Sequence, residues 1–336
     1  MILDPPTERN GDDLAMRAQL RELSGCLEGF GDSGDRDSTL TLLRLLYETG
    51  RRDLPLGRLF EGHVDALQIV TRYADPAVAR EVVVKAQRGA TFGVWNADLP
   101  GEPLRRDGNA VTGGKSFASG AGILSHALVT IDAPGGLQLL LVDLEAAPPA
   151  IDRDWWRVIG MERSRTHIVR WSAPPLEAFV TIGQQGDYVR EPWFSGGALR
   201  FVAVQAGGIA ALCDHVRDHL VATGRAAEPH QRGRLAALFD LADGAANVVR
   251  VAACAWFDDA AARLPRVAAA RAHVSAAADA ALTIAQQAVG LAGMFDAHPL
   301  SAALTNLMVY LRQPAPDAQR MAVGAAVADR RLVPGL

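Results

Sequence analysis

Apolar residues recur every three or four positions in the first quarter of the chain, which is the spacing of an amphipathic helix. The pattern predicts helices over 14–27, 40–47 and 57–73, and a loop of Gly, Asp and Ser over 29–38 separates the first two. Charged residues fill the positions between the apolar ones. We therefore expect residues 1–88 to form a small N-terminal helical domain.

From Gly89 the pattern changes to short apolar or alternating runs with turn residues between them. Asp107-Gly108-Asn109 and Pro134-Gly135-Gly136 stand where hairpins need turns, because glycine adopts positive φ without strain. Many short strands in succession indicate an antiparallel barrel or sandwich, and no GxGxxG motif follows a strand to favour a Rossmann domain. We expect this middle β domain over 89–188, with strands at 91–97, 110–119, 127–132, 137–142, 155–159, 166–171 and 178–182.

After a loop rich in Gly, Asp and Pro at 183–197, the chain becomes rich in alanine and helical again. One apolar stripe runs from Leu235 to Trp256, and we expect its helix to continue to Leu264, where Pro265 ends it. Long helices with small side chains can approach closely and form an antiparallel bundle. The bundle is expected over 189–336, with helices at 196–221, 235–264, 267–291 and 299–311.

Composition restricts the class of protein. A chain of 336 residues with 49% hydrophobic content has room for more than one core. The net charge of -4, without any block of basic residues, excludes a typical nucleic-acid partner. Cys26, Cys213 and Cys254 are odd in number and far apart, so they indicate neither disulfides nor zinc. Without a leader or a long uninterrupted apolar run, no membrane partner is expected, and the chain is expected to be cytoplasmic.

One segment of the middle domain carries a family motif. Residues 112–119, Thr-Gly-Gly-Lys-Ser-Phe-Ala-Ser, resemble the acyl-CoA dehydrogenase strand in which G-x-K precedes an aromatic, a small and a hydroxyl residue. In that superfamily the aromatic side chain packs on the flavin ring and the hydroxyl group contacts it. The resemblance implies these two roles for Phe117 and Ser119, and it implies the order of helices, β domain and bundle.

A second segment resembles the strand that lines the flavin in the same superfamily. It reads Phe92-Gly93-Val94-Trp95, and the resemblance implies cofactor contacts for Phe92, Val94 and Trp95. The family continues into a T-E-P-G-x-G-S-D turn. Here residues 95–101 read Trp-Asn-Ala-Asp-Leu-Pro-Gly, so the threonine and the Gly-Ser pair of the family are replaced.

Two further motifs resemble substrate elements of the family. Residues 159–164, Ile-Gly-Met-Glu-Arg-Ser, are similar to the G-M-R-x-S turn near the acyl-CoA entrance. Residues 200–208 are similar to the first bundle helix. The resemblance therefore implies substrate contacts for Ser164 and Arg200.

The bundle resembles the part of the family that reaches a dinucleotide held by the neighbouring subunit. Residues 287–293 are similar to the Q-x-x-G-G-x-G turn, and Arg225 stands where the family has R-x-x-F-G. An arginine fork suits a pyrophosphate. The resemblance implies FAD contacts by Arg225, Gln287 and Gly290, and a homo- or hetero-oligomer.

Dehydrogenation of an acyl-CoA needs a flavin to accept hydride and a carboxylate to remove the α proton. The family places a glutamate in a Y-E-G-T turn, but residues 305–316 contain none, and Gln313-Pro314 stands there. Glu191, in the loop before the bundle, is the candidate replacement base. The alternative interpretation is that Glu191 is an ordinary exposed acid of this loop.

The resemblance favours an FAD-dependent oxidoreductase that acts on an acyl-CoA or a related thioester. Two alternatives stay open: a flavin-dependent monooxygenase of the same fold, which needs no α-proton base, and a non-catalytic, flavin-free subunit of a hetero-oligomer. His215 and His219 are interpreted as a solvated helix face rather than a metal pair, so no metal site is expected. Trp155 and Trp156 are interpreted as core or interface rather than a ligand wall.

Overall fold

The computed structural model describes residues 6–313 and 315–335, with side chains from residue 11 onward. Its contacts divide the chain into two compact units, and each is described by itself. The first, called the β unit, contains the strands. The second, called the helical unit, contains the bundle. The β unit comprises the chain up to Ser33, Arg58–Arg157 and Glu162–Arg190, and the helical unit comprises Gly34–Gly57, Val158–Met161 and the chain from Glu191 onward.

Over the residues that the structure describes, the β unit has two sheets of four strands each. The strand orders are β1-β4-β5-β8 and β2-β3-β7-β6, and the pairing is antiparallel except between β1 and β4. The predicted fold class, an antiparallel β domain between helical regions, is confirmed. The strands are β1 (Phe92–Trp95), β2 (Arg105–Asp107), β3 (Ala110–Ala118), β4 (His126–Ala133), β5 (Gly136–Asp143), β6 (Ala150–Asp152), β7 (His167–Pro175) and β8 (Phe179–Ile182).

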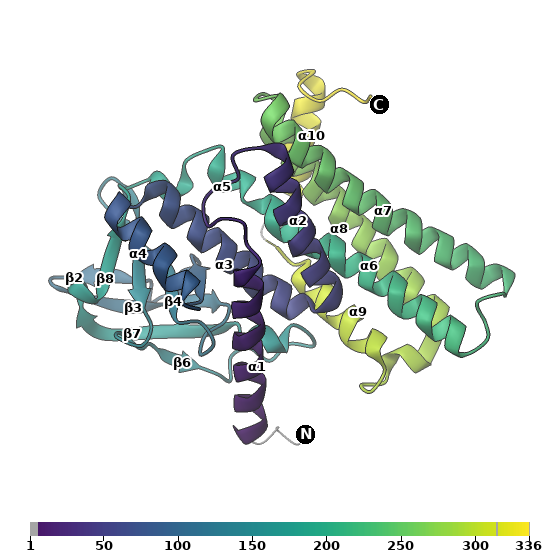
Figure 1. Ribbon diagram of the computed structural model, residues 1–336, viewed down its shortest axis with the longest axis horizontal. Helices are drawn as coiled ribbons and strands as arrows, with labels where there is room; N and C mark the ends of the chain where they lie inside the picture. The colour runs from purple at the N-terminus through teal and green to yellow at the C-terminus, as the bar shows by residue number, and fades with distance from the viewer. Residues whose placement is uncertain (1–5, 314, 336) are drawn as a thin grey trace. The chain divides into compact units, whose positions relative to one another are not determined.

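Two helices cover one face of the first sheet (Figure 1). Buried side chains of α3 (Leu54–Tyr73) and α4 (Pro76–Gln87) form one cluster with residues of β1, β4, β5 and β8. Leu67, Phe92 and Leu128 in this cluster have no exposed surface. Removing such apolar area from water is the main stabilising term of the unit.

The two sheets share a core that contains polar anchors. The Trp95 and Trp171 rings lie 6.3 Å apart, and the Trp171 indole donates to the Ala147 carbonyl at 2.9 Å. The fully buried Lys115 Nζ donates to Thr130 Oγ1 at 2.9 Å and to the Asp98 carboxylate at 2.5 Å. Burial lowers the pKa of Lys115, and these acceptors offset the cost of burying its charge.

Helix α1 (Pro6–Gly25) is attached to the β unit through arginine side chains. Arg17 Nε donates to the Ile123 carbonyl at 2.8 Å, and Arg17 Nη2 donates to the Gly122 carbonyl at 3.2 Å. Arg21 Nε donates to the Gly89 carbonyl at 2.8 Å. The groups that accept hydrogen bonds from these two arginines of α1 are therefore backbone carbonyls of two loops.

The helical unit is built around α6 (Ala198–Ala222), which lies beside α2 and the long helices of the bundle (Figure 1). Most side chains in the first half of α6 are buried, and the segment Trp193–Ala222 is the one described stretch long and apolar enough to cross a membrane. Of its apolar window, 72% is buried, as in the core helix of a soluble protein. The other helices are α2 (Arg36–Arg52), α5 (Trp193–Gly196), α7 (Pro229–Asp258), α8 (Arg263–Val289), α9 (Pro299–Tyr310) and α10 (Pro316–Ala328).

Helices α2 and α6 approach so closely that only glycine fits at their contact. A Cβ atom on Gly207 would lie 2.0 Å from the Tyr47 carbonyl oxygen, and one on Gly50 would lie 2.3 Å from the Val204 carbonyl oxygen. This reciprocal contact joins α2 to the bundle, although α2 lies in the predicted N-terminal domain 1–88. The compact units thus divide the chain differently from the predicted boundaries after residues 88 and 188.

The predicted strand at 155–159 is wrong. After β6 the chain turns, because Asp152 Oδ1 accepts the Asp154 N–H at 3.2 Å and the Arg157 N–H bonds to the Trp155 carbonyl at 3.0 Å. An Asp side chain that bonds its own backbone two residues on favours such a turn over a strand. Trp155 and Trp156 consequently lie in a loop.

Pro265 does not end a helix, as the apolar pattern suggested; it lies in the first turn of α8. Helix α7 ends earlier, at Asp258, and Asp259 Oδ1 accepts the N–H groups of Ala261 and Ala262 before α8 begins. Proline is tolerated in a first turn, since the N–H groups there have no intrahelical partner.

Candidate functional site

Strand β3 ends in a bulge that turns Phe117 outward. Lys115 pairs with Val169 and Ala118 pairs with His167, so β3 has one residue more than β7 between these pairs. Phe117 has φ of 53°, the left-handed region that a bulky residue rarely adopts, and its side chain is 56% exposed. Backbone outliers of this kind cluster at functional sites.

Two tryptophans accompany Phe117. The Phe117 and Trp155 rings meet edge to face at 4.9 Å, and Trp155 stacks on Trp156 at 6.0 Å. Trp155 is itself 38% exposed. Together Phe117, Trp155 and Trp156 form an exposed aromatic cluster on the β unit, a surface that suits a planar ring system. The sequence placed the tryptophans in a strand, and the turn after β6 is what brings them to Phe117.

A chain of buried hydroxyl groups lies beside the aromatic cluster. Ser119 Oγ lies 2.9 Å from Thr166 Oγ1, which lies 2.8 Å from Ser164 Oγ. The backbone fixes this arrangement, because the Gly120 N–H donates to the Ser164 carbonyl at 2.8 Å and the Trp95 indole donates to the Ser119 carbonyl at 2.9 Å. Ser119 and Ser164 are thus brought together. Thr166, which joins them, was not singled out in the sequence.

Cationic groups flank this region. Arg165 pairs with Asp13 at 2.6 Å, and the guanidinium of Arg153 lies against Gly122. Burial, followed by the charges of Arg153 and Arg165, lowers the pKa of His167 to about 4. Its buried Nδ1 has no hydrogen-bond partner among the described residues. His167 is therefore a neutral imidazole at pH 7.

The remaining predicted residues of the first strand face two cores rather than the aromatic cluster. Phe92 is fully buried with its ring 4.9 Å from that of His126, and Val94 is half-buried against the same core under α3 and α4. Trp95 points the other way, between the sheets. Alternation along the strand explains the division.

In the helical unit, the predicted dinucleotide residues lie at one end of the bundle. Gln231 Nε2 donates to the Ala288 carbonyl at 3.2 Å, so the start of α7 lies beside the end of α8. Gln287 is exposed there, and Gly290 ends α8 with φ of 71°. Arg225 pairs with Glu228 at 3.1 Å on the surface. These three residues therefore lie in one region of the unit.

Glu191 and Arg200 flank α5. Both carboxylate oxygens of Glu191 accept hydrogen bonds from Ser195, one from the N–H at 3.1 Å and one from the hydroxyl. Arg200 is half-buried, with its guanidinium against Gly197. To act as a base, Glu191 must give up these hydrogen bonds with Ser195 and accept a proton from the substrate.

The histidines of α6 are not simply a solvated face. His219 Nδ1 lies 3.0 Å from Nε2 of His298, whose Nδ1 accepts the Leu300 N–H at 3.1 Å and caps α9. Burial, followed by the neighbouring His298, lowers the pKa of His219. Within residues 6–313 and 315–335, no group of three His, Cys, Asp or Glu side chains is arranged to hold a metal ion.

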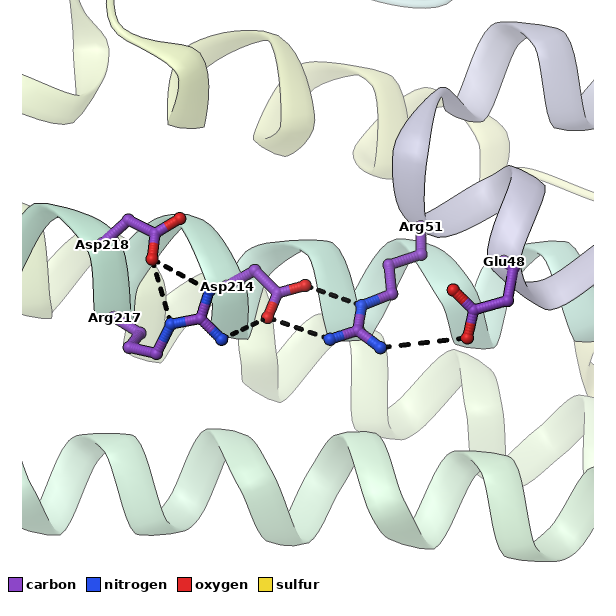
Figure 2. A network of polar contacts seen from close by, with 5 residues as sticks. All are labelled: Glu48, Arg51, Asp214, Arg217 and Asp218. Carbon is purple, nitrogen blue, oxygen red and sulfur yellow. Dashed lines mark hydrogen bonds and ion pairs between the residues drawn. The ribbon is translucent and has the colours of Figure 1, made fainter.

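An ion-pair network links α2 to α6 (Figure 2). Arg51 binds Asp214 through two hydrogen bonds, at 2.6 and 3.0 Å, and Arg217 reaches the same carboxylate at 2.8 Å. These bonds and charges outweigh the effect of burial and lower the pKa of Asp214. Arg217 also binds Asp218, and Glu48 lies 3.9 Å from Arg51.

Asp214→Asn is expected to lower the free energy of unfolding by about 1 kcal/mol, because the pair is bidentate and only partly exposed. Asp218→Asn, which alters the 66% exposed end of the network, should change it by less than about 0.5 kcal/mol. Urea unfolding at low and high salt measures both values. An equal effect of the two substitutions would mean that the contact between Arg51 and Asp214 adds nothing to the free energy of unfolding.

No family model matches the sequence, and no curated protein matches it. Its fold does match solved structures. Butyryl-CoA dehydrogenase from Megasphaera elsdenii superimposes with a TM-score of 0.76 at 16% identity, covering 93% of this chain and 89% of that one. Glutaryl-CoA dehydrogenase, in its glutaryl-CoA complex, gives 0.76 at 14% identity, covering 98% and 97%.

A third similar structure has another chemistry. The dibenzothiophene monooxygenase TdsC from Paenibacillus sp. A11-2, in complex with FMN and indole, gives a TM-score of 0.75 at 15% identity, covering 97% of each chain. Dehydrogenases and a monooxygenase thus share one architecture with this chain along almost its whole length. The chain has the fold of the acyl-CoA dehydrogenases.

Proposed function

We propose that this protein is a flavin-dependent oxidoreductase whose flavin ring rests on the aromatic cluster of Phe117, Trp155 and Trp156. The observation that carries the proposal is Phe117, held outward at positive φ by the bulge of β3 and 56% exposed. Backbone strain of this kind costs on the order of 1–3 kcal/mol and is concentrated at active sites and ligand-binding sites, so its occurrence at an exposed aromatic residue supports a binding role. The similar structures supply the precedent, since TdsC binds FMN and shares this fold.

The residues of this chain fit a flavin in distinct ways. The aromatic cluster offers an apolar surface to the ring, and the hydroxyl chain of Ser119, Thr166 and Ser164 can pass a hydrogen bond to a polar ring edge. The flavin, when bound, supplies the two-electron redox chemistry. We propose FAD as the form, with Arg225, Gln287 and Gly290 at its dinucleotide end in an oligomer of copies of this chain or of a homologue, in the cytoplasm.

Acyl-thioester dehydrogenation is the first proposed reaction, with Glu191 as the base that removes the substrate proton. Glu191 must then release Ser195 and bind the α hydrogen of the thioester in its place. Ser164 and Arg200 are the proposed substrate contacts. Butyryl-CoA and glutaryl-CoA dehydrogenases are named for such thioesters and share the fold.

A monooxygenase is the second candidate, and one observation favours it. Gln313 stands where the family has its catalytic glutamate, and its side chain donates to the Tyr310 carbonyl at 3.0 Å. An amide cannot remove an α proton. Oxygen activation on a flavin needs no base of that kind, and TdsC is a monooxygenase of this fold.

The absorption spectrum of the purified protein, before and after adding FAD or FMN, tests the flavin proposal. Bound oxidised flavin with anaerobic bleaching by butyryl-CoA supports dehydrogenation. Bound flavin without bleaching, together with oxygen-dependent turnover of an aromatic substrate such as indole, supports the monooxygenase. A protein that remains colourless with both flavins would contradict both enzymes and favour a non-catalytic subunit.

Phe117→Ala is expected to weaken flavin binding about tenfold or more, because stacking on an aromatic side chain contributes about 1–3 kcal/mol. Phe239→Ala is the matched control, since Phe239 is also an exposed phenylalanine, at 61%, but lies on α7. Quenching of flavin fluorescence measures both affinities. Equal affinities of the two variants would remove Phe117 from the site.

If bleaching by butyryl-CoA occurs, Glu191→Gln is expected to abolish it while leaving the flavin bound, because glutamine cannot accept the α proton. Asp187→Asn, which alters another acid of the same region, should bleach at the rate of the parent protein. Stopped-flow absorbance at the oxidised-flavin band measures the rate. Undiminished bleaching by the Glu191 variant would assign the base to another residue.

A further inference from the structure

The helical unit contains a small pocket to which no ligand has yet been assigned, and its lining includes Gln313, the residue at the position of the family's catalytic glutamate. Its cavity volume is about 40 Å³, several times what a single water molecule needs. Helices α6, α8 and α10 and the segment after α9 form its walls. The lining residues are Phe201, Gln205, Arg271, Ala272, Ser275, Leu311, Gln313, Pro316, Gln319 and Arg320.

Arg271 is the main charged group of the pocket. It is half-buried on α8, and its guanidinium carbon lies 5.2 Å from the centre of the Phe201 ring. Packing on an aromatic face restricts the orientation of the guanidinium plane, which reduces the entropy that a ligand must overcome. Burial lowers the pKa of Arg271, although an arginine remains charged at any physiological pH.

Two amide side chains of the pocket are held in place by hydrogen bonds to one backbone carbonyl. Gln205 Nε2 and Gln313 Nε2 both donate to the carbonyl of Tyr310, at 3.1 and 3.0 Å. Tyr310 is 4% exposed and Gln205 is 3% exposed, so this wall belongs to the core of the unit. A rigid wall on one side and a positioned arginine on the other define the shape of the ligand group.

The charge of the lining is one-sided. The ten lining residues that the structure describes include two arginines and no carboxylate side chain. Arg320 is 65% exposed and reaches Asp317, outside the lining, only at 4.0 Å, so it can turn toward a ligand. Phe201, Leu311 and Pro316 add apolar surface next to these charges. The combination matches a ligand with one anionic group and a short apolar chain.

We propose that this pocket binds the carboxylate group of a small organic acid, with Arg271 as its principal partner and Arg320 at its mouth. The planar guanidinium of Arg271 matches the two oxygens of a carboxylate. The cavity volume accommodates a carboxylate with part of a short chain. This site concerns the helical unit alone and does not rest on the flavin proposal.

Isothermal titration of the full-length protein with butyrate, and with its uncharged isostere butyramide, tests the proposal. Butyrate is expected to bind at least tenfold more tightly than butyramide, because only the carboxylate pairs with Arg271. Inorganic phosphate is the third probe. Tighter binding of phosphate than of butyrate, or equal binding of butyrate and butyramide, would overturn the proposal. Repeating the titration with added FAD separates this site from the flavin, since a colourless protein can still bind butyrate.

Arg271→Met is expected to weaken butyrate binding tenfold or more, and Arg320→Met several-fold. Arg312→Met is the matched control, because Arg312 stands between the lining residues Leu311 and Gln313 but pairs with Asp279 outside the pocket. Arg271→Lys keeps a charge and should retain more affinity than Arg271→Met, so it distinguishes lost binding from lost folding. Equal affinity of the Arg271→Met and Arg312→Met variants would contradict the site.

Discussion

Gly207→Ala is expected to lower the free energy of unfolding by about 3 kcal/mol, because a single methyl group overfills the contact between α2 and α6. The added Cβ would stand 2.0 Å from the Tyr47 carbonyl oxygen and 2.8 Å from the Arg51 nitrogen. Both obstacles are backbone atoms, which cannot turn aside as a side chain can. Urea unfolding followed by circular dichroism measures the loss.

Gly233→Ala is the matched control for this substitution. Gly233 also lies in a helix, α7, but a Cβ atom there would meet nothing within 4 Å. Alanine has the higher helix propensity, so this variant should be as stable as the parent or more stable by up to about 1 kcal/mol. If both variants unfold at the same urea concentration, the two helices do not approach as closely as described.

Acidification from pH 7 to pH 4 is expected to destabilise the protein strongly through His63. This side chain is fully buried, and burial lowers the pKa of His63 to about 4. Its Nε2 lies 2.9 Å from Ser24 Oγ, and its Nδ1 accepts the Phe92 N–H at 3.1 Å. A proton on Nδ1 would break the latter bond, so the folded state holds His63 neutral.

The sign of the effect follows from the lowered pKa. Between about pH 6.5, where histidine titrates in the unfolded chain, and about pH 4, the unfolded state binds a proton that the folded state does not. The stability contributed by neutral His63 is complete above this window and is lost as the pH falls through it. The difference between the two pKa values corresponds to a loss of about 3 kcal/mol in the free energy of unfolding. His167, whose pKa is also lowered to about 4, adds a loss of the same sign.

Urea unfolding at pH 7, 5.5 and 4 measures this dependence. His63→Gln is expected to be less stable than the parent at pH 7, because it loses the fitted imidazole, but to show a shallower slope with pH. His230→Gln, which changes an exposed histidine of α7, should keep the parent slope. A parent-like slope for the His63 variant would assign the acid sensitivity to other groups.

Much of the fold could be predicted from local patterns. Of the eight strands in the described part of the chain, six follow from alternation and turn residues, since these signals lie within a few residues of each other. The two strands not predicted, β2 and β6, have three residues each, and β2 is entirely exposed, so neither carries an apolar pattern. The place of α2 in the helical unit was not predictable either, because it depends on glycines about 150 residues apart in the chain.

The candidate site was only partly predictable. Phe117 and Ser119 were singled out by resemblance, but the outward turn of Phe117 depends on how β3 pairs with β7, some fifty residues later. Thr166 directly precedes β7, and the two tryptophans reach the site through the turn after β6, which pairs with the other side of β7. No sequence pattern indicated the pocket of Arg271 and Arg320, since its residues come from separate helices without a common motif.

The fold alone does not choose between the two proposed reactions. Dehydrogenases and a monooxygenase both resemble this chain at 14–16% identity, a level that establishes a shared architecture but not a shared chemistry. The choice depends on whether Glu191 leaves Ser195 to act as a base. The bleaching experiment therefore decides more than a further structural comparison could.

The attachment of α1 has a consequence for how the loop after β3 can vary. Arg17 and Arg21 bind carbonyl groups of Gly89, Gly122 and Ile123 rather than side chains. Every residue type offers a carbonyl, so substitutions in the loop leave these acceptors in place while its backbone keeps its path. The attachment therefore depends on the backbone path of the loop directly after Ser119, and the residues whose replacement would disturb that path are Gly120 and Gly122, which both have positive φ.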